Sequence, residues 1–204
     1  MSYNSYRPSQ SSTPVVINLI IINALVYLCQ RLFDGRTYWL TEKLALHTPG
    51  TFGFEPYQFI THMFAHSPAS IFHILFNMYA LWLFGAMLER NWGPIKFLIF
   101  YLACGLGAAV AQILFVPDGI SLGASGAVMG LMAAFAYTYP NVEFFIIPIP
   151  FALKAKWLVA IYVAIDLFGG IRGSDGIAHF AHLGGLAMGF ILMIFWIGKR
   201  RNRY

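Results

Sequence analysis

The chain has 204 residues, of which 59% are hydrophobic and 10% are charged. Its mean hydropathy is +0.67, whereas a soluble domain carries about 25% charged residues and far less apolar sequence. This composition excludes a soluble globular domain and predicts an integral membrane protein.

A transmembrane helix needs about 20 predominantly apolar residues, and six stretches approach or reach this length. Residues 1–13 are polar and lack the pattern of a signal peptide, so we expect a disordered cytoplasmic N-terminus. A membrane domain is expected over 14–198, and a basic cytoplasmic tail over 199–204. The apolar stretches lie at residues 14–33, 70–88, 95–116, 121–139, 154–169 and 177–197. Residues 144–150, which include two prolines, are expected to form an interfacial loop before the fifth stretch.

The basic residues predict the orientation of this all-α, six-helix bundle. With both termini in the cytoplasm, the inner side holds nine: Arg7, Arg90, Lys96, Lys154, Lys156, Lys199, Arg200, Arg201 and Arg203. The outer side holds four: Arg31, Arg36, Lys43 and Arg172. The positive-inside topology, beside an anionic lipid surface, therefore accounts for the net charge of +5. Nucleic-acid binding is not needed to explain it.

Polar residues on the second, fourth and sixth helices are expected at one depth, because these helices all run inward from the outer face. Ser125 lies about four residues into its helix and His182 about five, which places both roughly 6 to 8 Å below the outer end. His73 has a similar offset, and Asn77 lies one turn further along the same face. Their convergence favours a shared water-filled cavity, because isolated polar groups are costly in lipid.

These residue types suit nucleophilic catalysis. Ser125 begins a helix, where backbone N–H groups lack acceptors and favour negative charge, and a histidine can take its proton. His73 and Asn77 can offer N–H donors to a developing oxyanion. Small residues on the two facing helices would allow the close approach that a serine–histidine hydrogen bond requires; they are Gly123, Gly126, Gly130, Gly185 and Gly189.

Each of these residues has a simpler explanation. Ser125 among glycines also suits close helix packing in lipid. His179, three residues before His182, lies on nearly the same face, so spacing alone leaves both open as the partner of Ser125. His62 and His66 could bind zinc as an i, i+4 pair, although structural hydrogen bonding is the preferred interpretation. Nothing in the sequence places the intramembrane Asp166 beside His182, so we assign it no catalytic role.

Three motifs together resemble the rhomboid family of intramembrane serine proteases. They are Gly123-Ala-Ser-Gly126, His73-Ile-Leu-Phe-Asn77 and Ala181-His182-Leu-Gly-Gly-Leu-Ala-Met-Gly189, within a likeness that spans about residues 14 to 198. The resemblance implies a rhomboid-like bundle with a serine–histidine dyad, no acid, no metal and no cofactor. It makes Ser125 the nucleophile, His182 the general base and Gly123 the turn-forming glycine. His73, Asn77 and the Ser125 backbone N–H would form the oxyanion hole.

The resemblance predicts a serine endopeptidase that cleaves single-span membrane proteins in or near their transmembrane segment. Helix-destabilising residues near the cut are expected, because a regular helix hides its carbonyls. The fifth helix is the expected gate for substrate. Alternatives are a catalytically silent relative that binds membrane clients, and a small transporter, which would require more intramembrane acids and repeats. The compact chain and its topology predict a bacterial plasma (inner) membrane, with an organellar membrane as the alternative.

Overall fold

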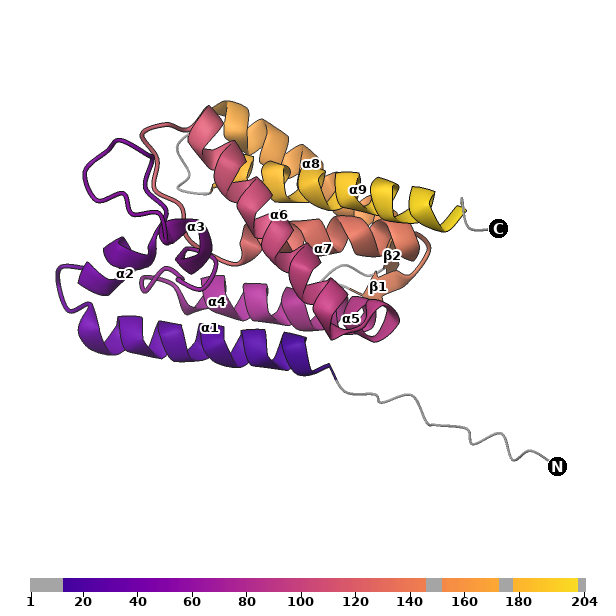
Figure 1. Cartoon of the computed structure of the whole chain (residues 1–204), viewed down its shortest axis with the longest axis horizontal. Coiled ribbons are helices and arrows are strands. Elements are labelled where there is room, and N and C mark those ends of the chain that lie inside the picture. Colours follow the sequence, from indigo (N-terminus) through magenta and orange to yellow (C-terminus); the bar gives the residue numbers. More distant parts are fainter. Residues whose placement is uncertain (1–12, 146–151, 173–177, 202–204) are drawn as a thin grey trace.

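The computed structural model describes residues 13–145, 152–172 and 178–201, with side chains up to Trp196. The described part is a helical bundle with one short hairpin (Figure 1). The first half comprises α1 (Pro14–Phe33), α2 (Trp39–Leu44), α3 (Gln58–Thr61), α4 (Ile71–Ala80), the π-helix η1 (Leu81–Gly85) and α5 (Ala86–Trp92). The second half comprises α6 (Pro94–Phe115), α7 (Ser125–Thr138), β1 (Glu143–Phe145), β2 (Ala152–Lys154), α8 (Ala155–Arg172) and α9 (His179–Arg201).

Helices form at all six predicted apolar stretches. Within the described ranges, four are long and apolar enough to cross a membrane: Pro14–Phe33, Ile71–Trp92, Pro94–Phe115 and His179–Trp196. The second of these joins α4, η1 and α5 end to end. Helix α7 is apolar but has only 14 residues, and α8 carries Lys156, Asp166 and Arg172. The chain is thus a helical membrane protein, and the count of six spans stays a prediction.

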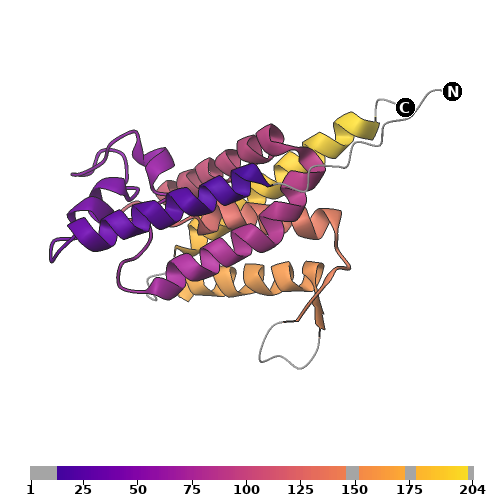
Figure 2. The same cartoon turned by 90° about the horizontal axis from the view of Figure 1, so that it is seen from below.

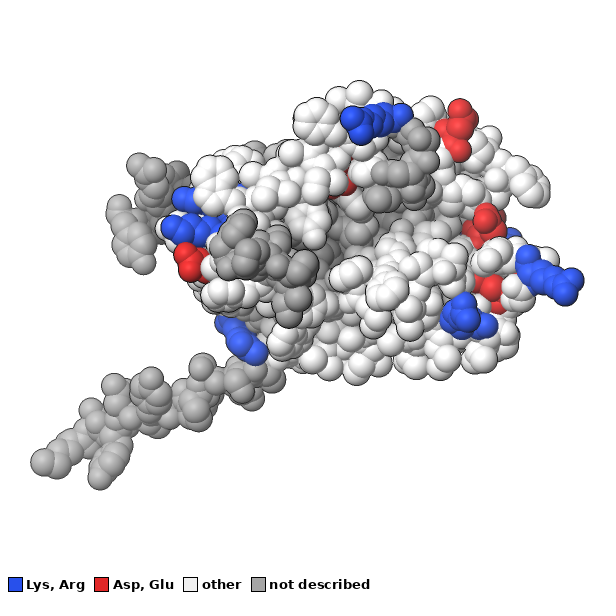
Figure 3. All heavy atoms as spheres, turned by 180° about the vertical axis from the view of Figure 1, so that it is seen from behind, with Lys and Arg blue, Asp and Glu red and all other residues white. Residues whose placement is uncertain are grey.

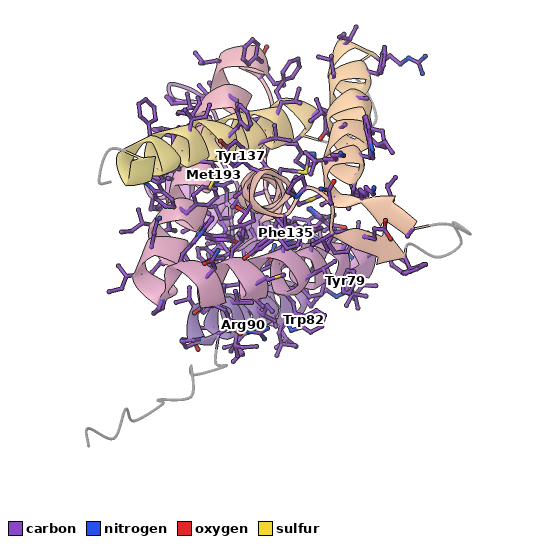
Figure 4. All side chains as sticks on the ribbon, turned by 90° about the vertical axis from the view of Figure 1, so that its right-hand side faces the viewer. Tyr79, Trp82, Arg90, Phe135, Tyr137 and Met193 are labelled. Carbon is purple, nitrogen blue, oxygen red and sulfur yellow. The ribbon has the colours of Figure 1, made fainter. Side chains whose placement is uncertain are left out.

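Helix α7 occupies the centre of the bundle. Seen end-on, it is surrounded by the other long helices, whereas Tyr79, Trp82 and Arg90 lie at the margin (Figure 4). Ten of its 14 residues are buried, as expected for a helix that is apolar on all sides. Its residue Phe135 packs against Phe84 of η1, with ring centroids 5.2 Å apart.

Helix α1 turns apolar side chains outward. They recur at helical spacing on one face: Ile17, Ile21, Leu25, Leu28 and Leu32. A broad surface on the back of the molecule is likewise free of charged residues, which gather toward its margins (Figure 3). Exposed apolar faces of this size suit contact with lipid rather than with water.

The N-terminal end of α1 is fixed by a long-range cap that the sequence did not suggest. The Glu89 carboxylate accepts hydrogen bonds from the backbone N–H groups of Val15 and Val16, both at 2.9 Å. Glu89 is only 2% exposed, and its charge complements the positive end of the helix dipole. Helices α1 and α5 are thereby joined at the end of the bundle where α9 also ends (Figure 1).

The expected loop at 144–150 contains part of a hairpin. Residues of β1 pair antiparallel with β2, with Glu143 opposite Lys154, and the hairpin extends from the bundle beside α8 (Figure 2). Phe144 alternates inward and packs on Phe84 and Phe135, which anchors the strand. The two prolines at 148 and 150, like residues 1–12 and 202–204, lie outside the described residues.

Candidate active site

Ser125 is the first residue of α7, so it lies nearer the helix N-terminus than the expected four residues in. The reason is local: Ser121 forms a β-bridge with Leu46, and Gly123 has a φ of +122°. Both hold the preceding segment out of the helix. The Gly123 N–H also donates to the His62 carbonyl at 2.8 Å, which fixes the turn before the serine.

His182, and not His179, lies next to Ser125. Its Nε2 is 2.8 Å from Ser125 Oγ, a normal hydrogen-bond distance between a serine and a basic partner. His182 is in the first turn of α9, so the two side chains project from the starts of neighbouring helices. The structure therefore brings together the two residues predicted as nucleophile and base.

The glycines permit this contact between α7 and α9. A Cβ added at Gly185 would overlap the carbonyl group of Gly126, and one added at Gly189 would lie 2.5 Å from the Gly130 carbonyl oxygen. Real Cβ atoms do not approach so closely, so the helices can lie at this separation only with glycine at these positions.

His73 is oriented as a hydrogen-bond donor toward the serine. The Ser67 backbone N–H donates to His73 Nδ1 at 3.2 Å, so in the neutral ring the proton is on Nε2. That nitrogen would lie 2.9 Å from a Cβ added at Gly123. It therefore faces the space immediately in front of Gly123 and Ser125.

Asn77 already uses part of its hydrogen-bonding capacity within its own helix. Its Nδ2 donates to the His73 carbonyl within α4 at 2.8 Å, which uses one of the two amide hydrogens. The second hydrogen remains for a ligand, because Asn77 lines the same cavity as His73 and Ser125.

This cavity has a volume of about 510 Å³. Its polar residues are Ser67, His73, Asn77, Ser121, Ser125 and His182, and the remaining walls are largely apolar side chains of α4, α7 and α8, among them Phe76, Met129 and Tyr162. An apolar pocket with a few convergent polar groups is the usual form of a binding site.

Asp166 corrects the sequence analysis, which had no reason to place it beside His182. Its Oδ1 accepts hydrogen bonds from Nδ1 of His182 at 2.9 Å and from Nδ1 of His179 at 2.7 Å. The residue is 3% exposed and lies on α8, two turns before its end. The available signal was that an intramembrane carboxylate needs a partner, and both histidines lie at similar depth.

The same three side chains form the one group of potential metal ligands identified among the described residues. Their donor atoms lie within 4.8 Å of one another, and two histidines with an aspartate suit zinc or iron. The separations of 2.7 and 2.9 Å are those of hydrogen bonds, which account for the cluster without an ion. We therefore assign no metal.

His62 and His66 do not form an i, i+4 pair on one helix, because α3 ends at Thr61, before both residues. His62 Nδ1 donates to the Gln58 carbonyl at 2.8 Å, and burial lowers the pKa of His62 to about 4. Burial, together with the neighbouring His73 ring, lowers the pKa of His66 to about 3. Both rings are therefore neutral at physiological pH. The His62 contact agrees with structural hydrogen bonding, the interpretation preferred from the sequence.

Comparisons with known proteins agree with the motifs. The family model described as the Rhomboid domain matches residues 53–199. The chain is 36% identical over 141 residues to the RHOMBOID-like protein 6, mitochondrial, of Arabidopsis thaliana, covering 69% of this chain and 43% of that protein. It is 31% identical over 216 residues to RHOMBOID-like protein 12, mitochondrial, of the same plant, covering 95% of this chain and 61% of the relative.

A human relative, the presenilin-associated rhomboid-like protein, mitochondrial, is 35% identical over 125 residues, with 59% of this chain and 33% of that protein covered. The chain thus spans between 33% and 61% of the length of these three relatives. Their names give no support to the predicted bacterial plasma membrane, since all three contain the word mitochondrial.

Proposed function

Because this chain belongs to the rhomboid family, we propose that it is a serine endopeptidase that cleaves single-span membrane proteins in or near their transmembrane segment. The observation that carries the proposal is the 2.8 Å contact between Ser125 Oγ and His182 Nε2, in a cavity that also holds His73 and Asn77. Serine and histidine in this arrangement are the minimal pair for acyl transfer.

The reaction begins when His182 Nε2 takes the hydroxyl proton of Ser125 as Oγ attacks the carbonyl carbon of the scissile bond. The tetrahedral intermediate collapses when His182 returns this proton to the leaving amine, and the C–N bond breaks. The acyl-enzyme is then hydrolysed by a water that His182 activates in the same way, which releases the second product and restores the serine.

The negative oxygen of the intermediate needs donors that are already in place. The Nε2–H of His73, the second amide hydrogen of Asn77 and the Ser125 backbone N–H at the start of α7 supply them. One such donor contributes about 2.7 to 4 kcal/mol, or about 10²- to 10³-fold in kcat. Asn77→Ala is therefore expected to lose turnover while Ser125 remains reactive.

Substrates are expected to carry helix-destabilising residues near the cut, since the scissile carbonyl must leave its helical hydrogen bond. We place substrate access between α4 and α8, because Phe76 and Tyr162 from these helices line the cavity. A cross-link between α4 and α8 should then abolish cleavage of a transmembrane substrate, and unchanged cleavage would contradict this route.

The proposed topology has six crossings with both termini in the cytoplasm. It rests on the charge asymmetry of the sequence and on six apolar helical segments, of which α7 and α8 are the short or charged ones. Accessibility labelling of single cysteines placed near Pro14 and near Phe115 tests it, since the two positions should lie on opposite sides. Fractionation of the producing cell tests the bacterial plasma membrane, which stays a prediction.

The decisive experiment is cleavage of a single-span test substrate by the detergent-purified protein. We expect Ser125→Ala and His182→Ala to abolish both cleavage and labelling by a fluorophosphonate probe. His179→Asn, the matched control from the same helix turn, can still donate a hydrogen bond to Asp166 and should keep both. A wild-type protein that neither cleaves several substrates nor labels would favour the alternative, a silent relative that binds membrane clients.

A further inference from the structure

The carboxylate of Asp166 is built into the contact between α8 and α9. One oxygen, Oδ1, accepts from Nδ1 of both His179 and His182, and the side chain is almost completely buried. The helices approach closely here because Gly169, one turn after Asp166 on α8, leaves room for the His179 ring, which a Cβ at this position would overlap. Two hydrogen bonds to one buried oxygen distinguish Asp166 from a polar residue that merely meets water at a helix end.

We propose that Asp166 is a positioning residue for His182, so that the site works as a Ser125–His182–Asp166 array. This inference rests on the proposed function and changes it in one respect, since the family resemblance implied a dyad without an acid. Asp166 itself touches neither the scissile bond nor Ser125; it acts through the imidazole.

The first consequence of the contact concerns the tautomer of His182. A carboxylate can only accept, so Nδ1 of His182 must carry the proton that it donates to Oδ1. In the neutral ring Nε2 then bears the lone pair, and this is the nitrogen 2.8 Å from Ser125 Oγ. The acid thereby fixes the tautomer that is able to take the serine proton.

The second consequence concerns charge. His182 becomes an imidazolium when it accepts the serine proton, and Asp166 places a negative charge 2.9 Å from its Nδ1. In a buried site such a pair interacts strongly. Among the residues that the structure describes, the other titratable groups near His182 are His179, which shares Oδ1, and His73 across the cavity. Neither histidine can supply negative charge, so Asp166 has no substitute among these neighbours.

His179 steadies the acid and does not compete for the serine. Its hydrogen bond to the same oxygen holds the carboxylate in one rotamer, and its ring lies against α8 at Gly169. His179→Asn can donate its amide hydrogen from nearly the position of Nδ1, so this variant should keep most of its turnover.

The test compares Asp166→Asn with the wild type in cleavage kinetics. Asparagine keeps an oxygen that can accept both hydrogen bonds, removes the charge, and replaces the buried Oδ2 with an amide NH2 group. A positioning role predicts that kcat falls about 10²- to 10⁴-fold, the range in which an orienting acid and its base operate, with little change in KM. Leu158→Ala is the matched control, because Leu158 is a buried residue of α8 that lies eight residues, or about 12 Å along the helix, before Asp166; it should lower thermal stability more than kcat.

A second measurement requires no substrate. In ¹⁵N spectra of histidine-labelled protein, with His182 assigned through His182→Asn, the wild type should show the proton on Nδ1. Asp166→Ala should shift the population toward the Nε2–H tautomer. A merely structural role would leave the His182 tautomer unchanged in Asp166→Ala and kcat unchanged in Asp166→Asn, and either result would overturn the proposal.

The two proposals fail in distinguishable ways. A silent wild type whose His182 still changes tautomer in Asp166→Ala would refute the protease and keep the positioning. An active wild type that loses cleavage in Ser125→Ala but keeps it in Asp166→Asn would refute the positioning and keep the protease. Loss of wild-type activity with a chelator, or an Nδ1–H signal that appears only after chelation, would show that the three donors hold a metal, and would overturn the positioning as well.

Discussion

Gly123 is the position where one added methyl group tests the geometry of the site most directly. The residue has a φ of +122°, a backbone conformation that L-residues other than glycine rarely adopt. A Cβ there would lie 2.9 Å from His73 Nε2 and 3.7 Å from Ser125 Oγ. Gly123→Ala therefore places a carbon in the space assigned to the oxyanion.

Two separate costs follow from this substitution. The backbone strain should lower the free energy of unfolding by about 1 to 3 kcal/mol. The methyl group also denies the substrate oxygen access to His73, which is equivalent to losing one donor, or about 2.7 to 4 kcal/mol of transition-state stabilisation. We expect kcat to fall about 10²- to 10³-fold.

Gly93→Ala separates the two costs. Gly93 has a φ of +83°, but a Cβ there meets no atom within 4 Å, and it lies between α5 and α6, far along the chain from Ser125. Cleavage of a single-span substrate and thermal unfolding are measured for both variants. Gly93→Ala should show the strain alone, with near-normal kcat. Equal turnover in the two variants at equal stability would refute the assignment of this space to the oxyanion.

Three further predictions concern the frame of the site. Gly185→Ala should part α7 and α9 by roughly 1 Å, because its Cβ overlaps the Gly126 carbonyl group, and a misplacement of this size lowers kcat about 10²-fold; fluorophosphonate labelling rates check this. Glu89→Ala removes the cap on α1 and should cost about 2 kcal/mol, measured as a lower Tm with the active-site contacts intact. His62 should make stability depend on pH. Its folded-state pKa of about 4 lies below the unfolded value, so its contribution is complete above pH 6.5 and is lost as pH falls toward 4. The loss is up to about 1.4 kcal/mol per pH unit. His62→Asn, which can still donate to the Gln58 carbonyl, should make the Tm profile less steep over this window, and His66 supplies the dependence that remains.

The long apolar helices were predictable, because a run of about 20 apolar residues is by itself long enough to cross a bilayer as a helix. The start of α7 was not, since the segment before Ser125 is kept out of the helix by a turn at Gly123 and a bridge to Leu46. The hairpin was missed for a related reason. Phe144 reads as part of an apolar loop until the rings that it packs against, Phe84 and Phe135, are known.

A histidine of α9 as the partner of Ser125 could be anticipated from equal predicted depth on two helices and from the glycines between them. The choice of His182 over His179 came from the family motif and its small-residue flank. The position of Asp166 could not, because its helix runs in the opposite direction and the rotation of α8 about its axis is fixed only by packing. Sequence spacing relates residues on one helix, whereas the contact of Asp166 with His182 depends on how two helices face each other.

Helix α8 contributes both Tyr162, in the wall of the cavity, and Asp166, beside the base. An outward displacement of α8 large enough to admit a transmembrane segment would carry the Asp166 carboxylate away from His182. The cavity could then be open to substrate, or the hydrogen bond between Asp166 and His182 could be formed, but not both at once. A polypeptide that diffuses in and out while α8 is displaced would meet a weakened base and leave uncut. Only a segment that lets α8 return to its place would face the complete site, so residence time as well as sequence would select what is cleaved.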